Sequence, residues 1–126
     1  MKILIAGSRT LDPWNYPQVV RVLLQGIPGS YDLQWVTGCA SGIDEIPFVL
    51  KDLYDEYETT EIHRFPVTKE DWDTHGKKAG YLRNQVMAEY CDAAIIIWDG
   101  KSKGTKHMID IMFEYPDKPT IIYKVT

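Results

Sequence analysis

Short apolar runs alternate with amphipathic stretches along the whole chain. Runs rich in β-branched residues, such as 93–98, are typical of strands that are buried on both faces of a sheet. Each run is bounded by glycine, proline, serine, threonine or aspartate, which are common where a strand ends. We expect five strands, at residues 2–6, 33–36, 59–65, 93–98 and 120–125.

The segments between these runs predict helices, because their apolar residues recur three and four positions apart. The apolar faces lie within Val19 to Leu24, Ile46 to Tyr57, Leu82 to Tyr90 and Met108 to Phe113. In the third segment we expect Leu82, Val86 and Tyr90 to form the buried face. Residues 67–78 are largely polar, and we expect a long loop there, of the kind that often carries function.

The alternation of strands with helices predicts an α/β fold. Strands joined by short helical connections pair in parallel, and helices then cover both faces of the sheet. We therefore expect one three-layer domain over residues 1–126 with a central parallel sheet. The nearly continuous apolar runs 2–6 and 93–98 should lie side by side at its centre.

Composition narrows the classes of partner. The chain has 14 lysines and arginines against 18 aspartates and glutamates, a formal net charge of -4. A broad basic face is needed to bind the nucleic-acid backbone, so we do not expect nucleic acid as a partner. No apolar run is long enough to span a membrane or to act as a signal peptide. We expect a cytoplasmic protein.

The metal-binding residue types show no recognisable spacing. Cys39 and Cys91 form no metal-binding or redox motif, and we expect two free thiols. His63, His75 and His107 do not have the spacing of zinc ligands. We expect neither a metal nor a cofactor.

The loop after the run 93–98 has the features of a phosphate site. It supplies Gly100, Ser102, Gly104 and Thr105, and a helical pattern begins at its end. The unpaired N–H groups and the dipole of a helix start favour an anion, and hydroxyl groups add further donors. An ordinary strand-to-helix turn with solvated lysines is the competing interpretation.

Two other loops of this kind follow the runs 2–6 and 33–36, so three such loops should meet at the carboxyl edge of the sheet. A helical stretch with Gly80, Arg83 and Asn84 adds donors. Asp44 is equally suited to contact a ligand or to cap the following helix. The predicted ligand-binding residues are Gly7, Ser8, Arg9, Thr10, Thr37, Gly38, Ala40, Ser41, Gly42, Asp44, Gly80, Arg83, Asn84, Asp99, Ser102, Gly104 and Thr105.

Four stretches together resemble a known group: Gly7-Ser-Arg9, Thr37-Gly-Cys-Ala-Ser-Gly-Ile-Asp44, Ala79-Gly-x-x-Arg-Asn84 and Ser102-Lys-Gly-Thr105. They are similar to the YspA-like branch of the SLOG superfamily, named for the DNA-processing Smf/DprA proteins and the Lonely Guy (LOG) enzymes. Members of this branch occur widely in bacteria and their phages. The resemblance spans nearly the whole chain. It implies a Rossmann-like fold and a pocket for nucleotides or nucleotide-derived ligands.

One departure bears on catalysis. LOG-type phosphoribohydrolases have Pro-Gly-Gly-x-Gly-Thr followed closely by a catalytic glutamate. Here Gly104-Thr105 is followed by Lys106, His107 and Met108, and the first acid is Asp110. Arg83 matches the family's helix arginine. Asp44 and Asp99 are the candidate replacements for the missing carboxylate, which would stabilise an oxocarbenium-like sugar.

We therefore expect a protein that binds a nucleotide or an ADP-ribose-like molecule, as a sensor or a sequestering protein, for example in phage counter-defence. The first alternative is a LOG-like enzyme that hydrolyses nucleoside monophosphates at the glycosidic bond. The second is a DprA-like single-strand DNA binder, which the acidic charge disfavours. LOG-type relatives suggest a homo-oligomer, with Trp14, Tyr16, Trp72 and Tyr81 as candidate contacts.

Overall fold

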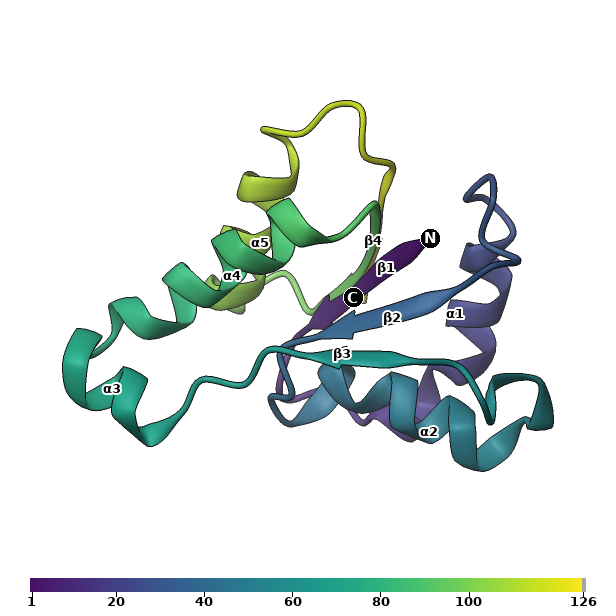
Figure 1. Ribbon diagram of the computed structural model, residues 1–126, viewed down its shortest axis with the longest axis horizontal. Helices are drawn as coiled ribbons and strands as arrows, with labels where there is room; N and C mark the ends of the chain where they lie inside the picture. The colour runs from purple at the N-terminus through teal and green to yellow at the C-terminus, as the bar shows by residue number, and fades with distance from the viewer. Residues whose placement is uncertain (126) are drawn as a thin grey trace.

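The computed structural model describes residues 1–125 and contains a five-stranded, all-parallel sheet in the order β3-β2-β1-β4-β5 (Figure 1). The strands are β1 (Lys2–Gly7), β2 (Gln34–Thr37), β3 (Ile62–Arg64), β4 (Ala93–Trp98) and β5 (Thr120–Lys124). The strand order reverses direction at β1, so the sheet has a topological switch point there. This architecture confirms the predicted α/β class and is Rossmann-like.

Helices cover both faces of the sheet. The α-helices are α1 (Pro17–Leu24), α2 (Ile46–Leu53), α3 (Lys69–His75), α4 (Lys78–Tyr90) and α5 (Lys103–Met112). Three short 3-10 helices are η1 (Pro13–Asn15), η2 (Gly42–Glu45) and η3 (Asp55–Tyr57). Helices α1 and α2 pack on one face, while α4 and α5 pack on the other (Figure 1).

The alternation of side chains along β1 builds two separate cores. Ile3 and Ile5 pack with α1 and α2, whereas Leu4 and Ala6 pack with α4 and α5. All four are buried, as expected for a central parallel strand. β1 pairs with β4 in register from Ile3↔Ala93 to Gly7↔Ile97. The predicted neighbouring positions of the runs 2–6 and 93–98 are thus confirmed.

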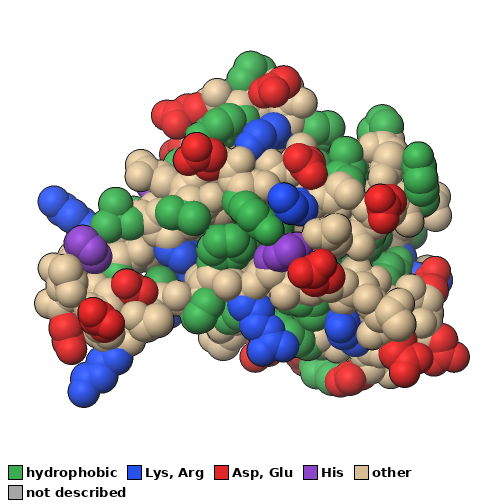
Figure 2. Space-filling model, viewed as in Figure 1, with side chains coloured by type: hydrophobic (Ala, Val, Ile, Leu, Met, Phe, Trp, Pro, Cys, Tyr) green, Lys and Arg blue, Asp and Glu red, His purple; other side chains and the backbone are tan. Residues whose placement is uncertain are grey.

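The predicted polar loop at 67–78 is wrong, because the segment contains α3. Thr68 caps this helix through a capping box: its hydroxyl accepts from the Asp71 N–H at 3.1 Å, and the Asp71 carboxylate accepts from the Thr68 N–H at 2.9 Å. The helix lacks an apolar stripe, so hydrophobic periodicity could not reveal it. It projects from the body and packs only lightly on α4 (Figures 1 and 2).

The predicted buried face of α4 is wrong at two of its three positions, since only Tyr90 packs against the core, where it is half-buried. Leu82 and Val86 are 43% and 53% exposed. The inward residues are instead Ala79, Asn84, Met87 and Ala88. Small alanines let α4 approach the sheet and α5 closely, whereas branched side chains at those positions would hold it away.

Two simpler predictions concern cysteine chemistry and membrane segments. Cys39, which is half-buried, and Cys91, which is buried, are both free thiols, as predicted. Within residues 1–125, no helix has the combination of length and hydrophobicity that crossing a bilayer requires.

Gly7 is the point where three segments of the chain converge. A Cβ at this position would lie 2.3 Å from the Ile97 carbonyl oxygen and 2.6 Å from the Ile43 Cβ. Both neighbours are buried and held by the sheet or by η2, so neither can withdraw. The end of β1 therefore accepts only glycine at this level of the sheet.

We expect Gly7→Ala to lower the free energy of unfolding by about 1–3 kcal/mol or more, because overpacking a rigid site forces backbone shifts. Gly80→Ala is the matched control, since no heavy atom lies within 4 Å of its added Cβ. That control should be neutral or stabilising, as alanine favours a helix interior. Urea denaturation measures both, and equal effects would contradict this account of Gly7.

Candidate functional site

The carboxyl ends of β1, β2 and β4 bring three loops together beside α4 and the start of α5. A pocket of about 200 Å³ lies among them. It is lined by Ala6, Gly7, Arg9, Ala40, Asp44, Lys77, Gly80, Tyr81, Arg83, Asn84, Met87, Ser102, Gly104, Thr105 and Met108. Open α/β sheets bind their ligands at this edge and at such a switch point.

In the loop after β1, some residues hold neighbouring loops together and one residue faces the pocket. Ser8 is fully buried; its N–H donates to the Ile97 carbonyl at 3.1 Å and its hydroxyl accepts from the Asp99 N–H at 3.0 Å. Thr10 also binds the Asp99 carboxylate, at 3.2 Å. These bonds tie the β1 and β4 loops together. Arg9 is exposed and lines the pocket, where its guanidinium is available to an anion.

The loop after β2 is shaped by its own internal contacts. The buried Thr37 hydroxyl donates to the Asp44 carbonyl at 2.7 Å. Gly42 has φ +81, and a Cβ there would lie 2.5 Å from the Ser8 carbonyl oxygen. These residues therefore serve the fold, while Ala40 and Asp44 reach the pocket.

The Asp44 side chain faces the pocket and does not cap a helix. It is 5% exposed, its carboxylate accepts from the Ala40 N–H at 3.3 Å, and the residue that caps α2 is Glu45. Burial raises the pKa of this carboxyl to about 6, although the nearby Arg83 guanidinium acts in the opposite direction. A buried carboxyl group in a pocket, with its pKa moved towards neutrality, is a common feature of functional sites.

Arg83 links α4 to the β2 loop. Its Nη1 donates to the Gly38 carbonyl at 2.8 Å and its Nε to the Asn84 side chain at 3.3 Å. Burial lowers the pKa of this guanidinium, which nevertheless stays charged, as arginine does in proteins. Within residues 1–125, Arg83 forms no ion pair with any acid within 4.0 Å.

Asn84 joins α4 to α5. This buried amide donates to the Gly104 carbonyl at 3.4 Å and lies 3.2 Å from the His107 Nδ1. Asn84 therefore holds the start of α5 at a set distance from Arg83. The two side chains, adjacent in sequence, position opposite walls of one pocket.

The loop after β4 is organised by Asp99. Its carboxylate accepts from the N–H groups of Lys101 and Ser102, both at 2.8 Å. These backbone bonds lower the pKa of Asp99 to about 2, so it is an anion at every physiological pH. Asp99 does not line the pocket. We therefore assign it to the turn and not to acid–base chemistry.

The start of α5 faces the pocket. Ser102 caps the helix, because its hydroxyl accepts from the Thr105 N–H at 3.4 Å and lies 3.0 Å from the Thr105 hydroxyl. A Cβ on Gly104 would meet no heavy atom within 4 Å, and Gly80 across the pocket is equally open. These two glycines leave space at the positive end of the helix dipole.

Charge in the pocket favours an anion. Arg9, Lys77 and Arg83 supply three cationic side chains, whereas Asp44 is the single acidic side chain among the lining residues. The positive lining contrasts with a chain whose net charge is -4. Among residues 1–125, no three histidine, cysteine, aspartate or glutamate side chains are grouped as metal ligands.

The structure brings ten of the predicted site residues to the pocket wall: Gly7, Arg9, Ala40, Asp44, Gly80, Arg83, Asn84, Ser102, Gly104 and Thr105. The other seven lie outside the lining: Ser8, Thr10, Thr37, Gly38, Ser41, Gly42 and Asp99. Sequence reasoning missed five lining residues: Ala6, Lys77, Tyr81, Met87 and Met108. From the sequence pattern, Ala6, Met87 and Met108 look like ordinary core residues. Lys77 lies in no recognised motif.

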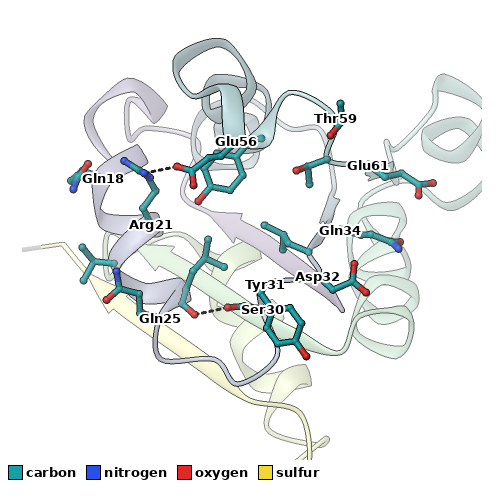
Figure 3. A pocket seen from close by; sticks show the side chains of 15 residues that line it. Gln18, Arg21, Gln25, Ser30, Tyr31, Asp32, Gln34, Glu56, Thr59 and Glu61 are labelled. Atoms are coloured by element: carbon teal, nitrogen blue, oxygen red, sulfur yellow. Dashed lines mark hydrogen bonds and ion pairs between the residues drawn. The ribbon is translucent and has the colours of Figure 1, made fainter.

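A larger hollow, of about 880 Å³, lies at the opposite edge of the sheet, between α1, η3 and the start of β2 (Figure 3). Among the described residues that line it, the one cationic side chain, Arg21, forms an ion pair with Glu56, and the lining also holds Asp32 and Glu61. The Ser30 hydroxyl donates to the Leu24 carbonyl. Acidic side chains gather over the end of α2 and the loop after it (Figure 2). This hollow is unsuited to an anion.

The fold and the pocket define a Rossmann-like α/β domain with a positively charged pocket at the carboxyl edge of its sheet. The chain is 34% identical over 112 residues to the Gene 61 protein of Mycobacterium phage D29, which covers 84% of this chain and 83% of the phage protein. The chain belongs to the same protein family as Gene 61 protein. No family model and no solved structure matches it.

The buried Asp44 predicts a specific pH dependence of stability. Its pKa of about 6 lies above the ordinary 3.8, so between these values the folded protein binds more protons than the unfolded chain. Stability should therefore fall as pH rises from about 4 to 6. Asp44→Asn should flatten this slope, by up to about 3 kcal/mol over the window.

Urea denaturation at intervals from pH 4 to 7 measures the effect, with Asp73→Asn as the control because Asp73 is exposed on α3. Identical pH profiles for wild type and Asp44→Asn would show that Asp44 is not the buried acid described above.

Proposed function

We propose that this protein binds a nucleotide or a nucleotide-derived small molecule, such as an ADP-ribose-like compound, in the pocket at the carboxyl edge of the sheet. The YspA-like SLOG resemblance supports this class of ligand. Binding without turnover suits a sensor or a sequestering protein. The phage origin of a relative is compatible with a role in counter-defence.

The observation that carries the proposal is that three cationic side chains lie beside the N-terminus of α5, where the space in front of the helix is free. Arg9, Lys77 and Arg83 surround the space beside Gly104 and Gly80. A phosphate there would receive charge-assisted hydrogen bonds from guanidinium groups and backbone donors from the first turn of α5.

The rest of the pocket offers groups that suit a nucleoside. The Asp44 carboxylate is an acceptor for sugar hydroxyls, which is the role that an acidic residue has in dinucleotide-binding folds. Met87 and Met108 give the pocket an apolar floor of adaptable side chains. Small-molecule sites commonly combine an apolar lining with a few placed polar groups.

Arg83→Ala should weaken nucleotide binding by about tenfold or more, since a hydrogen bond to a charged group contributes about 1.5–3 kcal/mol. The matched control is Arg21→Ala, which removes the same charge at the opposite edge of the sheet. Gly80→Leu is a second variant that fills the pocket without removing any contact.

Mass spectrometry of small molecules released from the purified protein selects the nucleotide, and isothermal titration then compares the variants. Unchanged affinity in both Arg83→Ala and Gly80→Leu would refute the assignment of this pocket.

A second candidate function is hydrolysis of the glycosidic bond of a nucleoside monophosphate, as in LOG-type enzymes. The observation that favours it is Asp44, a buried carboxyl in the pocket with a pKa of about 6. Such a group can stabilise the oxocarbenium-like sugar or position the attacking water.

If this enzyme activity exists, incubation with a panel of nucleoside monophosphates should release free base, and Asp44→Asn should abolish the release. Asp73→Asn is the control, because Asp73 is exposed on α3 and lies outside the pocket lining. Chromatography of the free bases provides the measurement. Absence of base from every nucleotide would leave binding alone as the function.

A further inference from the structure

A hollow of about 450 Å³, distinct from the larger one beside α1, adjoins the pocket on the β4–α5 side. It is lined by Tyr81, Trp98, Gly100, Lys101, Lys103, Lys106, His107 and Asp110. Tyr81 lines both the pocket and this hollow, so the two spaces meet at its ring. We call the second space the lysine groove.

The lysine groove is a concentrated positive surface on an acidic protein. Lys101 and Lys103 form no ion pair within 4.0 Å among residues 1–125, whereas Lys106 is paired with Asp110 at 2.5 Å. Lys124 adds a fourth cation, because its Cε lies 2.9 Å from the position that a Cβ on Gly100 would occupy. Unpaired lysines at this density attract a second anionic group.

The wall between the pocket and the groove is aromatic. The Tyr81 and His107 rings pack with centroids 4.3 Å apart, and Asn84 holds the imidazole through its Nδ1 at 3.2 Å. Tyr81 remains 41% exposed, so one surface of its side chain is open to a ligand. If a bound ligand extends from the pocket into the groove, its base or sugar crosses the Tyr81 ring. Nucleobases stack on aromatic rings of this kind.

The groove has a preorganised edge. Trp98 donates from its Nε1 to the Ser102 carbonyl at 3.1 Å, and Asp99 holds the N–H groups of Lys101 and Ser102. The backbone that carries Lys101 and Lys103 is therefore held in place before any ligand arrives. Preorganisation reduces the entropy that binding would otherwise cost.

The size of the pocket supplies the remaining argument. Pockets that enclose a small-molecule ligand are usually about 300–1,000 Å³, so a space of about 200 Å³ holds only part of a nucleotide. Its neighbour past Tyr81 is larger and positively charged. The two spaces together match a ligand with two phosphate groups, one in each space.

We infer that the ligand is larger than a mononucleotide and carries a second phosphate group, which lies in the lysine groove against Lys101 and Lys103. This inference rests on the proposed function and specifies its ligand class. The shared chemistry is a nucleotide with at least two phosphates. The second phosphate can be joined as a pyrophosphate or through a phosphodiester.

The test compares three probes for each of the four RNA bases: the nucleoside 5′-monophosphate, the nucleoside 5′-diphosphate and the 5′-phosphorylated dinucleotide. Isothermal titration measures each against wild type and the double variant Lys101→Ala/Lys103→Ala. The matched control is Lys51→Ala/Lys69→Ala, which removes two charges from α2 and α3, outside both spaces. Circular dichroism verifies that both double variants fold.

For at least one base, we expect the diphosphate or the dinucleotide to bind wild type about tenfold more tightly than the monophosphate. The Lys101→Ala/Lys103→Ala variant should lose most of that advantage and keep the monophosphate affinity, whereas the control variant should keep both. The advantage should also shrink as salt is raised. The probe that shows this advantage identifies how the second phosphate is joined: the diphosphate indicates a pyrophosphate, and the dinucleotide indicates a phosphodiester.

The contrary outcomes separate the two proposals. If the monophosphate binds and neither larger probe binds more tightly, the inference fails and the proposed function stands. The inference also fails if the groove variant weakens all three probes equally, or if the control variant loses the same advantage. If no probe binds wild type at all, both proposals fail together.

Discussion

The structure depends on one close approach, at the end of β1. Gly7 lets the Ile97 carbonyl and the Ile43 side chain come within a distance that any side chain would prevent. Ser8, the next residue, then bonds to the backbone of β4 and of the loop after it. The β1 and β4 loops are thereby drawn together, and the β2 loop closes against them through Gly42. The three loops that wall the pocket thus approach one another at two points where a side chain on Gly7 or Gly42 would not fit.

Opposite charges are buried at the pocket without forming a direct ion pair. Arg83 donates to the Gly38 carbonyl and Asp44 accepts from the Ala40 N–H, so each charge is satisfied mainly by the backbone of the β2 loop. Burial acts against both charged forms, raising the pKa of Asp44 and lowering that of Arg83. Burial of these two charged groups disfavours their charged forms, and charged groups buried in this way cluster at functional sites. This is consistent with the proposed binding function. The lysine groove extends the same positive field beyond Tyr81.

The sequence pattern predicts an element of the fold when that element depends on residues close together in the chain. The run 93–98 is apolar at every position and rich in isoleucine, which is typical of a central strand with two covered faces. The α4 helix could be placed but not oriented, because Leu82 and Val86 look like core residues while Ala79 and Ala88 make the close contact. Helix α3 was invisible to hydrophobic periodicity, since Thr68 and Asp71 form it through a capping box and not through a buried stripe.

By itself, the sequence determined the α/β class with a central parallel sheet, the central pair of strands and the three loops at one sheet edge. Those features follow from apolar runs and from turn residues that act on their near neighbours. Only the tertiary structure decided which loop residues face the pocket. Ser8, Thr37 and Asp99 carry the same polar groups as ligand-binding residues, yet the folded chain uses them to bond its own loops. Lys77 belongs to no motif and Tyr81 stands at an unspecified position of one; both reach the pocket because α4 packs where it does. Contacts between segments far apart in the chain set both outcomes, and no local pattern records them.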